Sequence, residues 1–370
     1  MLLCRGSLGL LCCAHAVLGL RAPPPKEALS LGPPSIVLGG IGDSGTSAVI
    51  SAIQRLGLVH CKKHNVWEEP ESAGMTPDGF KRVDIIRGML ELGHFKMTQA
   101  AYQTYPMMWE KSLEYVLHLA RMEGECIQKQ WLNEGKLDQV DPEGRQTSLQ
   151  TQWPNEGKLD QAPASWGFKE PHFGWLLPSM DAAYELRTKY LIIARDPRDV
   201  CNGLLQDQFQ SYGEQLWITD CYIWWAKYWN ELLNRYESTA RLKVLRIEDL
   251  VVPDPTQGSS SFDVLQCVLN FAGLASDTSA VMNVLTKFHS VLDAPGPLDK
   301  NMMHELEGFH NYSSHYLGHR FGQTGEALRE LERKVANHTD PILRNSMLRL
   351  GYNFTNFGLL KPASVSVCSR

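Results

Sequence analysis

The sequence predicts an α/β fold in which a parallel β-sheet is flanked by helices in three layers. Short apolar runs alternate with longer amphipathic stretches along the chain. This alternation is typical of parallel sheets whose strands are joined by crossover helices. The chain has 370 residues, 43% hydrophobic and 21% charged. That length and composition suit one large globular domain.

The expected elements follow from the apolar runs and their periodicity. Strands are expected where short apolar runs are bounded by turn residues or charges, at 35–38, 165–169, 189–195 and 242–250. Helices are expected where apolar residues recur at helical spacing, at about 46–56, 107–130 and 216–236. A second short apolar segment, "LGLVH" at 56–60, follows the first helix.

The N-terminal region divides into a leader and a linker before this domain. Residues 1–21 contain a short apolar run from about Ser7 to Leu20, with Ala14 and Ala16 in an A-x-A arrangement, which predicts a signal peptide or a short signal anchor. A Pro-rich linker follows at 22–34, and the domain is expected to span 35–360. These features predict that the protein enters the secretory pathway and is located in the Golgi lumen or secreted. The alternative is an organellar or cytoplasmic location. Membrane contact is expected only through the N-terminal segment.

Charge and cysteine content exclude several classes of function. The net charge is −5 with a pI near 6.2, so nucleic acid is not an expected partner. Six of the nine cysteines remain if the leader is removed, and none forms a C-x-x-C pair, so no metal site is expected. An even number permits disulfides and leaves their pairing open. Three N-x-[ST] sequons, at Asn311, Asn337 and Asn353, fit a lumenal address.

One internal repeat interrupts the domain. The segment "QWLNEGKLDQ" at 130–139 recurs as "QWPNEGKLDQ" at 152–161. Two copies are too few for a solenoid. We expect an insertion at about 125–165, either a local duplication in a surface loop or a lid over the substrate.

The segment "SIVLGGIGDSGTSAVISAIQRLG" predicts a strand, a glycine-rich turn and a helix. Gly40, Gly45 and Ser47 have the spacing of a phosphate-binding P-loop, but Thr46 stands where the motif has lysine. Such a turn aims backbone N–H groups and the positive end of the helix at an anion. The resemblance to a P-loop implies a three-layer sandwich like that of P-loop NTPases. The candidate binding residues are Gly42, Asp43, Ser44, Gly45, Thr46 and Ser47.

Two further strand ends carry candidate site residues. "KYLIIARDPRDV" ends a strand at Arg195, where an α/β sheet binds ligands, although an ion pair with Asp199 would also explain this arginine. "WGFKEPHFGWLLP" places Lys169, Glu170 and His172 at the end of another strand, where a cation and a base could act on one substrate.

Taken together and in this order, these motifs resemble the PAPS-dependent sulfotransferase family, where PAPS is 3′-phosphoadenosine 5′-phosphosulfate. The motifs that match are Ser44-Gly45-Thr46, the strand end Arg195-Asp-Pro-Arg-Asp199, the lysine frame from Lys169 to Pro178, and "VLRIEDLVVPDP" with "VLNFAGL" behind it. The resemblance covers roughly residues 35–275. It implies that the loop binds the 5′-phosphosulfate and that Arg195 binds the 3′-phosphate.

Three positions depart from the family pattern. Asp43 stands where the family commonly has a lysine, and it is expected to cap the helix or bind a basic neighbour. Gly203 replaces a serine, for which Asn202 could substitute. Pro171 occupies the slot of the usual histidine base, and His172 comes next.

The resemblance implies transfer of a sulfuryl group from PAPS to a hydroxyl acceptor, with carbohydrate favoured, no metal, and PAP as product. Lys169 would stabilise the leaving oxygen, and His172, or Glu170 if the geometry prefers it, would act as base. Two alternatives remain: a P-loop nucleotide kinase or NTPase, and a non-catalytic relative that binds nucleotide or glycan. The tryptophans of 216–236 could stack on a sugar, but a tryptophan stripe at helical spacing is more typical of core.

Overall fold

The computed structural model describes residues 31–41, 45–61, 106–137, 165–170, 173–184, 186–201, 218–236, 238–251, 261–275, 277–292, 333, 335–337, 340–355, 360 and 368. Its strands are β1 (Ile36–Gly40), β2 (Gly167–Lys169), β3 (Lys189–Ala194) and β4 (Leu242–Arg246). Its longer helices are α2 (Thr46–Arg55), α5 (Pro106–Leu137), α6 (Phe173–Ala183), α9 (Ile218–Tyr236), α11 (Ser261–Ala272), α12 (Thr278–Leu292) and α17 (Pro341–Leu350), and α10 (Ile247–Val251) is short.

The four strands form one parallel sheet in the order β2-β1-β3-β4, which confirms the predicted fold class. In register, Leu38 of β1 lies between Lys169 of β2 and Leu191 of β3. Val59 adds an isolated parallel bridge to Trp166, so the predicted apolar segment at 56–60 extends the β2 edge. Because all strands run the same way, their carboxyl ends meet at one edge of the sheet.

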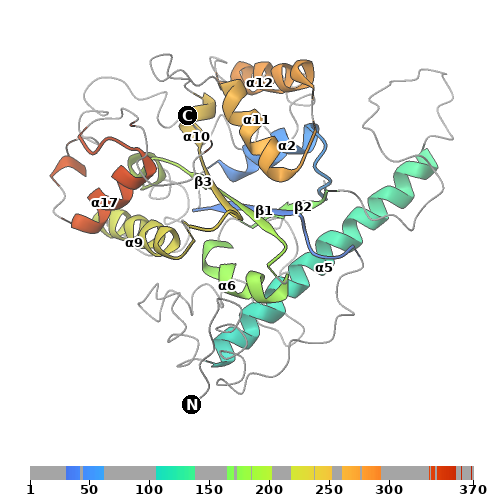
Figure 1. Ribbon diagram of the computed structural model, residues 1–370, viewed down its shortest axis with the longest axis horizontal. Coiled ribbons are helices and arrows are strands. Elements are labelled where there is room, and N and C mark those ends of the chain that lie inside the picture. The colour runs from blue at the N-terminus through green and yellow to red at the C-terminus, as the bar shows by residue number, and fades with distance from the viewer. Residues whose placement is uncertain are drawn as a thin grey trace.

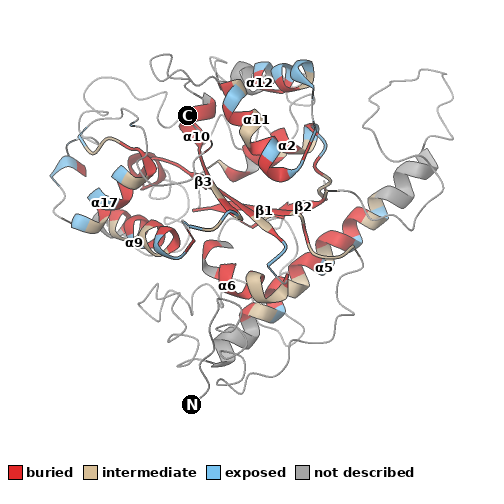
Figure 2. Ribbon diagram, viewed as in Figure 1, coloured by how far each residue is buried: buried red, intermediate tan, exposed pale blue. Residues whose placement is uncertain are grey.

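Helices cover both faces of the sheet (Figure 1). Alternate strand residues face opposite sides, so the sheet divides the apolar interior into two clusters. On one face Val37, Phe168 and Ile192 pack with residues of α5, α6, α9 and α17. On the other, Leu38 and Leu191 pack with residues of α2, α11 and α12. The strands are buried on both faces, as Figure 2 shows, which explains their nearly continuous apolar sequences.

Two elements differ from their sequence-based boundaries. The run at 242–250 is a strand only as far as Arg246, after which residues 247–251 form α10. Helix α5 extends past the predicted end to Leu137, so residues 130–137 of the first repeat copy are helical and not a loop. The second copy lies outside the described residues.

All six cysteines from Cys61 onward are paired in disulfides. Cys61 bonds Cys126 and ties the β2 edge to α5, and Cys201 bonds Cys221 of α9. Cys267 of α11 bonds Cys368, whose main-chain N–H donates to the Val244 carbonyl at 3.1 Å. The last contact covers part of the β4 edge. Within the described part of the chain, no helix is both long enough and apolar enough to cross a membrane.

Candidate functional site: the carboxyl edge of the sheet

Three of the predicted site segments meet at the carboxyl edge of adjacent strands. Thr46 begins α2 after the turn that follows β1, Lys169 ends β2, and Arg195 directly follows β3. These strands are neighbours in the sheet, with β1 in the centre. The topology therefore brings together segments that lie up to about 150 residues apart in the sequence, as expected for ligand sites of open α/β sheets.

The turn before α2 depends on glycine. Gly45 has φ +86°, a left-handed conformation that residues with a side chain rarely adopt. A Cβ atom there would also lie 3.1 Å from Cγ1 of Ile247. No acidic residue occupies the first turn of α2, so nothing in that turn neutralises the positive end of the helix. Thr46 is buried in this first turn.

Lys169 and Glu170 lie on opposite faces at the end of β2. Lys169 is in register with Leu38, whose side chain faces the α2 side, so the lysine is directed to the same side as the glycine turn. Glu170 is fully buried and accepts a hydrogen bond from the Tyr115 hydroxyl of α5 at 3.2 Å. Burial, and then the negative charge of Glu170, raise the pKa of the nearby Tyr184 well above its usual range. Glu170 thus anchors the end of β2 to α5.

Arg195 is almost completely buried where β3 ends. Its Nε lies 3.9 Å from Oδ2 of Asp199, one helical turn later, so the ion pair considered from the sequence is present. Its carbonyl accepts a hydrogen bond from Nε1 of Trp225 at 3.2 Å, which fixes the backbone against α9. This position suits an arginine that binds an anionic ligand, and it also suits an arginine with a purely structural role.

The rest of the R-D-P-R-D motif is structural. Asp196 caps the helical turn at 197–201 by accepting from the Arg198 main-chain N–H at 2.9 Å. Its carboxylate also takes two hydrogen bonds from the Arg198 guanidinium, at 2.8 and 2.6 Å. The Asp196 main-chain N–H donates to Glu248 Oε1 at 2.9 Å, and the Tyr352 hydroxyl donates to Glu248 Oε2 at 2.9 Å. This buried network joins β3, α10 and the segment after α17.

A second buried ion pair lies at the end of β4. Arg246 donates from Nε and Nη2 to Asp249 at 2.7 Å each, and from Nη1 to the carbonyls of Gly351 and Leu360. Burial alone would lower the pKa of Arg246, but hydrogen bonds to Asp249 and its charge outweigh burial and raise that pKa. Burial, then the charge of Glu248, raise the pKa of Tyr352 well above its usual range.

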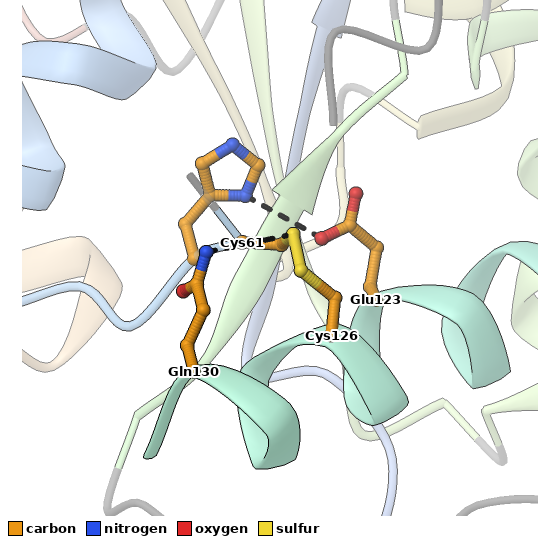
Figure 3. The surroundings of a disulfide bond; sticks show 5 residues. Cys61, Glu123, Cys126 and Gln130 are labelled. Carbon is orange, nitrogen blue, oxygen red and sulfur yellow. Dashed lines mark hydrogen bonds and ion pairs between the residues drawn. A yellow bond between two sulfur atoms is a disulfide. The ribbon is translucent and has the colours of Figure 1, made fainter. Parts of the chain in front are cut away.

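The edge of the sheet beside β2 carries a histidine–carboxylate pair next to a disulfide. Nδ1 of His60 lies 3.7 Å from Oε2 of Glu123 on α5, and both side chains are largely buried. Figure 3 shows Glu123 close to the Cys61–Cys126 disulfide, with Gln130 one turn further along α5. This pair and the disulfide hold the start of the "HCKKH" segment against α5.

The structure leaves part of the predicted site outside its described residues. This holds for Gly42, Asp43, Ser44, Pro171, His172, Asn202 and Gly203, and for the side chain of Ser47. Their roles stay predictions. Among the described residues, no cluster of histidine, cysteine, aspartate or glutamate could hold a metal ion.

Sequence reasoning missed the buried network of Arg198, Arg246, Glu248, Asp249 and Tyr352. The available signal was the density of charges immediately after two fully apolar strands, in R-D-P-R-D and R-I-E-D. The prediction that the tryptophans belong to the core is confirmed for Trp225 and Trp229, which are fully buried. Trp224 is only partly buried and packs against that core, and Trp217 lies outside the described residues.

No family model matches the chain, and no curated protein matches it at a significant level. Solved structures that it resembles include sulfotransferases. The sulfotransferase domain of the curacin biosynthetic pathway is 16% identical, with 87% of this chain and 98% of that chain covered and a TM-score of 0.39. A sulfotransferase from Mycobacterium avium is 13% identical, with 84% and 82% covered and a TM-score of 0.37. One from Alicyclobacillus acidocaldarius is 13% identical, with 80% and 98% covered and a TM-score of 0.31. These likenesses are distant, so a function must rest on this chain's own residues.

Proposed function

We propose that this chain is a sulfotransferase that moves a sulfuryl group from PAPS to a hydroxyl acceptor, with carbohydrate the favoured class. The observation that carries the proposal is the meeting of the Gly45–Thr46 turn, Lys169 and Arg195 at one sheet edge. A glycine turn into a helix whose first turn carries no acidic residue, with a lysine and an arginine on the flanking strands, suits a ligand with two separate anionic groups.

In this proposal PAPS lies across the carboxyl ends of β2, β1 and β3. Its 5′-phosphosulfate binds residues 42–47, and its 3′-phosphate takes the place of Asp199 beside the Arg195 guanidinium. A contact of 3.9 Å is longer than a hydrogen bond, so a phosphate oxygen at about 2.8 Å would be a stronger partner for Nε. The hydrogen bond from Trp225 Nε1 to the Arg195 carbonyl holds the main chain from which the guanidinium extends.

The transfer step needs an acceptor, a base and a stabilised leaving group. The acceptor oxygen bonds to sulfur while the bond from sulfur to the bridging phosphate oxygen breaks, and PAP leaves. Lys169 and the N-terminus of α2 stabilise the charge that develops on the leaving oxygen. His172 accepts the acceptor's proton. Glu170 has a structural role in this proposal, because its carboxylate is buried and accepts a hydrogen bond from the Tyr115 hydroxyl.

Neither the transfer nor the donor requires a divalent cation, because no terminal triphosphate must be neutralised. A P-loop kinase would use the motif lysine and magnesium to reach the β- and γ-phosphates, and Thr46 cannot replace that lysine. The kinase is therefore the second candidate, and a non-catalytic binding relative is the third.

Ligand-induced thermal stabilisation separates the three candidates. PAP without metal is expected to raise Tm, since a ligand that binds only the folded chain stabilises it. Arg195→Ala should weaken PAP more than adenosine 5′-phosphosulfate, which lacks the 3′-phosphate. A strong shift with ATP and magnesium but none with PAP would support the kinase. Stabilisation by PAP without turnover of radiolabelled PAPS on any hydroxyl acceptor would support the binding relative.

The proposed location is the lumen of the secretory pathway. Three disulfides that use all six cysteines beyond the leader suit an oxidising compartment. Expression of the full chain with a lumenal or cytoplasmic reporter at its C-terminus tests this assignment.

A further inference from the structure

The main chain and the side chain of Asn353 are held by different partners. Its carbonyl oxygen accepts a hydrogen bond from Nη2 of the buried Arg198 at 3.0 Å. Its side-chain Oδ1 accepts from both the main-chain N–H and the hydroxyl of Thr355, at 3.0 and 2.9 Å. Asn353, Phe354 and Thr355 therefore form a closed turn just after α17.

These contacts fix the orientation of the Asn353 amide. A main-chain N–H can only donate, so the atom facing Thr355 must be the oxygen Oδ1, and Nδ2 points away from the turn. Nδ2 donates to no other described residue, and Asn353 is partly exposed while Thr355 is exposed. The nitrogen is thus the side-chain atom of Asn353 that takes part in none of these hydrogen bonds.

We propose that Asn353 is modified by an N-linked glycan. Asn353-Phe354-Thr355 is an N-x-[ST] sequence without proline, the acceptor sequence for this modification. Nδ2 attacks the anomeric carbon of a lipid diphosphate-linked oligosaccharide supplied in the secretory pathway. A carbon–nitrogen bond forms, the bond from that carbon to the diphosphate oxygen breaks, the lipid diphosphate leaves, and Nδ2 loses one proton.

The fold tolerates a glycan at this position without losing a contact. The reaction consumes one N–H of Nδ2, while both bonds to Thr355 use Oδ1 and the bond from Arg198 uses the main-chain carbonyl. The two other sequons give no comparable structural argument. Asn311 and the threonine that completes the Asn337 sequon, Thr339, lie outside the described residues.

A glycan at Asn353 would lie at the same edge of the sheet as the candidate donor site. Arg198, which binds the Asn353 carbonyl, belongs to the helical turn that begins two residues after Arg195. The inference goes beyond the proposed function and does not depend on sulfuryl transfer. It requires entry into the secretory pathway, which the three disulfides favour.

Peptide mapping of the full chain, purified from a eukaryotic cell line with its leader intact, tests the site. Enzymatic deglycosylation in heavy-oxygen water should convert Asn353 to labelled aspartate in the peptide that contains it. Asn353→Gln and Thr355→Ala should each increase the mobility of the protein on a gel by the equivalent of one glycan. In Thr355→Ser and Asn337→Gln the Asn353 peptide should remain modified. An unlabelled Asn353 in the wild-type chain, secreted or not, overturns the proposal. PAP stabilisation of the same preparation tests the proposed function separately.

Discussion

The carboxylate of Asp196 and the guanidinium of Arg198 form a bidentate ion pair, and both side chains are completely buried. Arg195, only three positions earlier, pairs with Asp199 at a longer distance, 3.9 Å from Nε to Oδ2. The two arginines of one motif thus have different environments. Arg198 is committed to the fold, and Arg195 is the arginine that we propose binds an anion.

Arg198→Met should destabilise the folded chain by about 3–5 kcal/mol, because it leaves the buried Asp196 carboxylate without its cation. Urea unfolding measures this loss. Arg195→Met is the matched control: it removes another buried arginine, and it should cost less stability while abolishing stabilisation by PAP. If Arg195→Met were the more destabilising change and PAP still bound, the two roles would be reversed.

Gly45→Ala should lower the free energy of unfolding by about 1–2 kcal/mol from backbone strain alone, since φ is +86°. Its Cβ would also approach Ile247 at 3.1 Å, so the total loss should be larger. Gly57→Ala isolates the first effect, because Gly57 has φ +104° with nothing within 4 Å of the added Cβ. If the two variants lost equal free energy of unfolding, Ile247 of α10 would have to move aside for the added methyl group at no further cost.

Lys169→Ala should lower the turnover of PAPS by about a hundredfold, the scale of removing one transition-state donor, with little change in PAP affinity. Lys243→Ala is the control, since Lys243 lies early in β4 and contacts Cys267 and the Phe271 ring instead. Steady-state rates with an identified acceptor provide the measurement.

His172→Ala is the companion variant, and it should remove a limb of the pH–rate profile at about pH 6–7. Near-full sulfation by both Lys169→Ala and His172→Ala would contradict the catalytic assignment. Glu170 and the segment at 60–64, where His60 already pairs with Glu123, would then be the next candidates.

The stability of the fold should fall above about pH 10, the ordinary pKa of tyrosine. Burial and then the charge of Glu248 raise the pKa of Tyr352 in the folded chain. The unfolded chain therefore loses this proton first, so the contribution of Tyr352 is full below about pH 10 and is lost as pH rises further. Tyr352→Phe should cost about 1–3 kcal/mol at pH 8, because Glu248 loses a donor, and should give a shallower decline at high pH. The measurement is the free energy of unfolding in urea as pH rises. If this free energy fell equally steeply in the wild-type chain and in Tyr352→Phe, the assignment to Tyr352 would be wrong.

The strand-turn-helix at 36–55 and the parallel sheet could be predicted because their signals are local. Apolar runs of strand length, glycine at the turn and helical spacing after it all lie within a few residues of each other. The rule that parallel strands share a carboxyl edge then predicts that Lys169 and Arg195 lie near this turn.

The remaining features depend on contacts between distant segments. The disulfide partners are 65, 20 and 101 residues apart, and no spacing rule selects them. Residues 247–250 look like a continuing strand, but Glu248 and Asp249 turn the chain by binding the Asp196 N–H and the Arg246 guanidinium. The role of Tyr352 has no local signal, because its partner Glu248 is 104 residues away.

The disulfides determine which backbone cuts would separate the chain into pieces. A protease that cleaves once between residues 62 and 125, 202 and 220, or 268 and 367 leaves fragments joined by Cys61–Cys126, Cys201–Cys221 or Cys267–Cys368. Such a nicked protein migrates as one band on a non-reducing gel and as two after reduction. A single cut between 127 and 200, which includes the second repeat copy, releases two fragments under either condition.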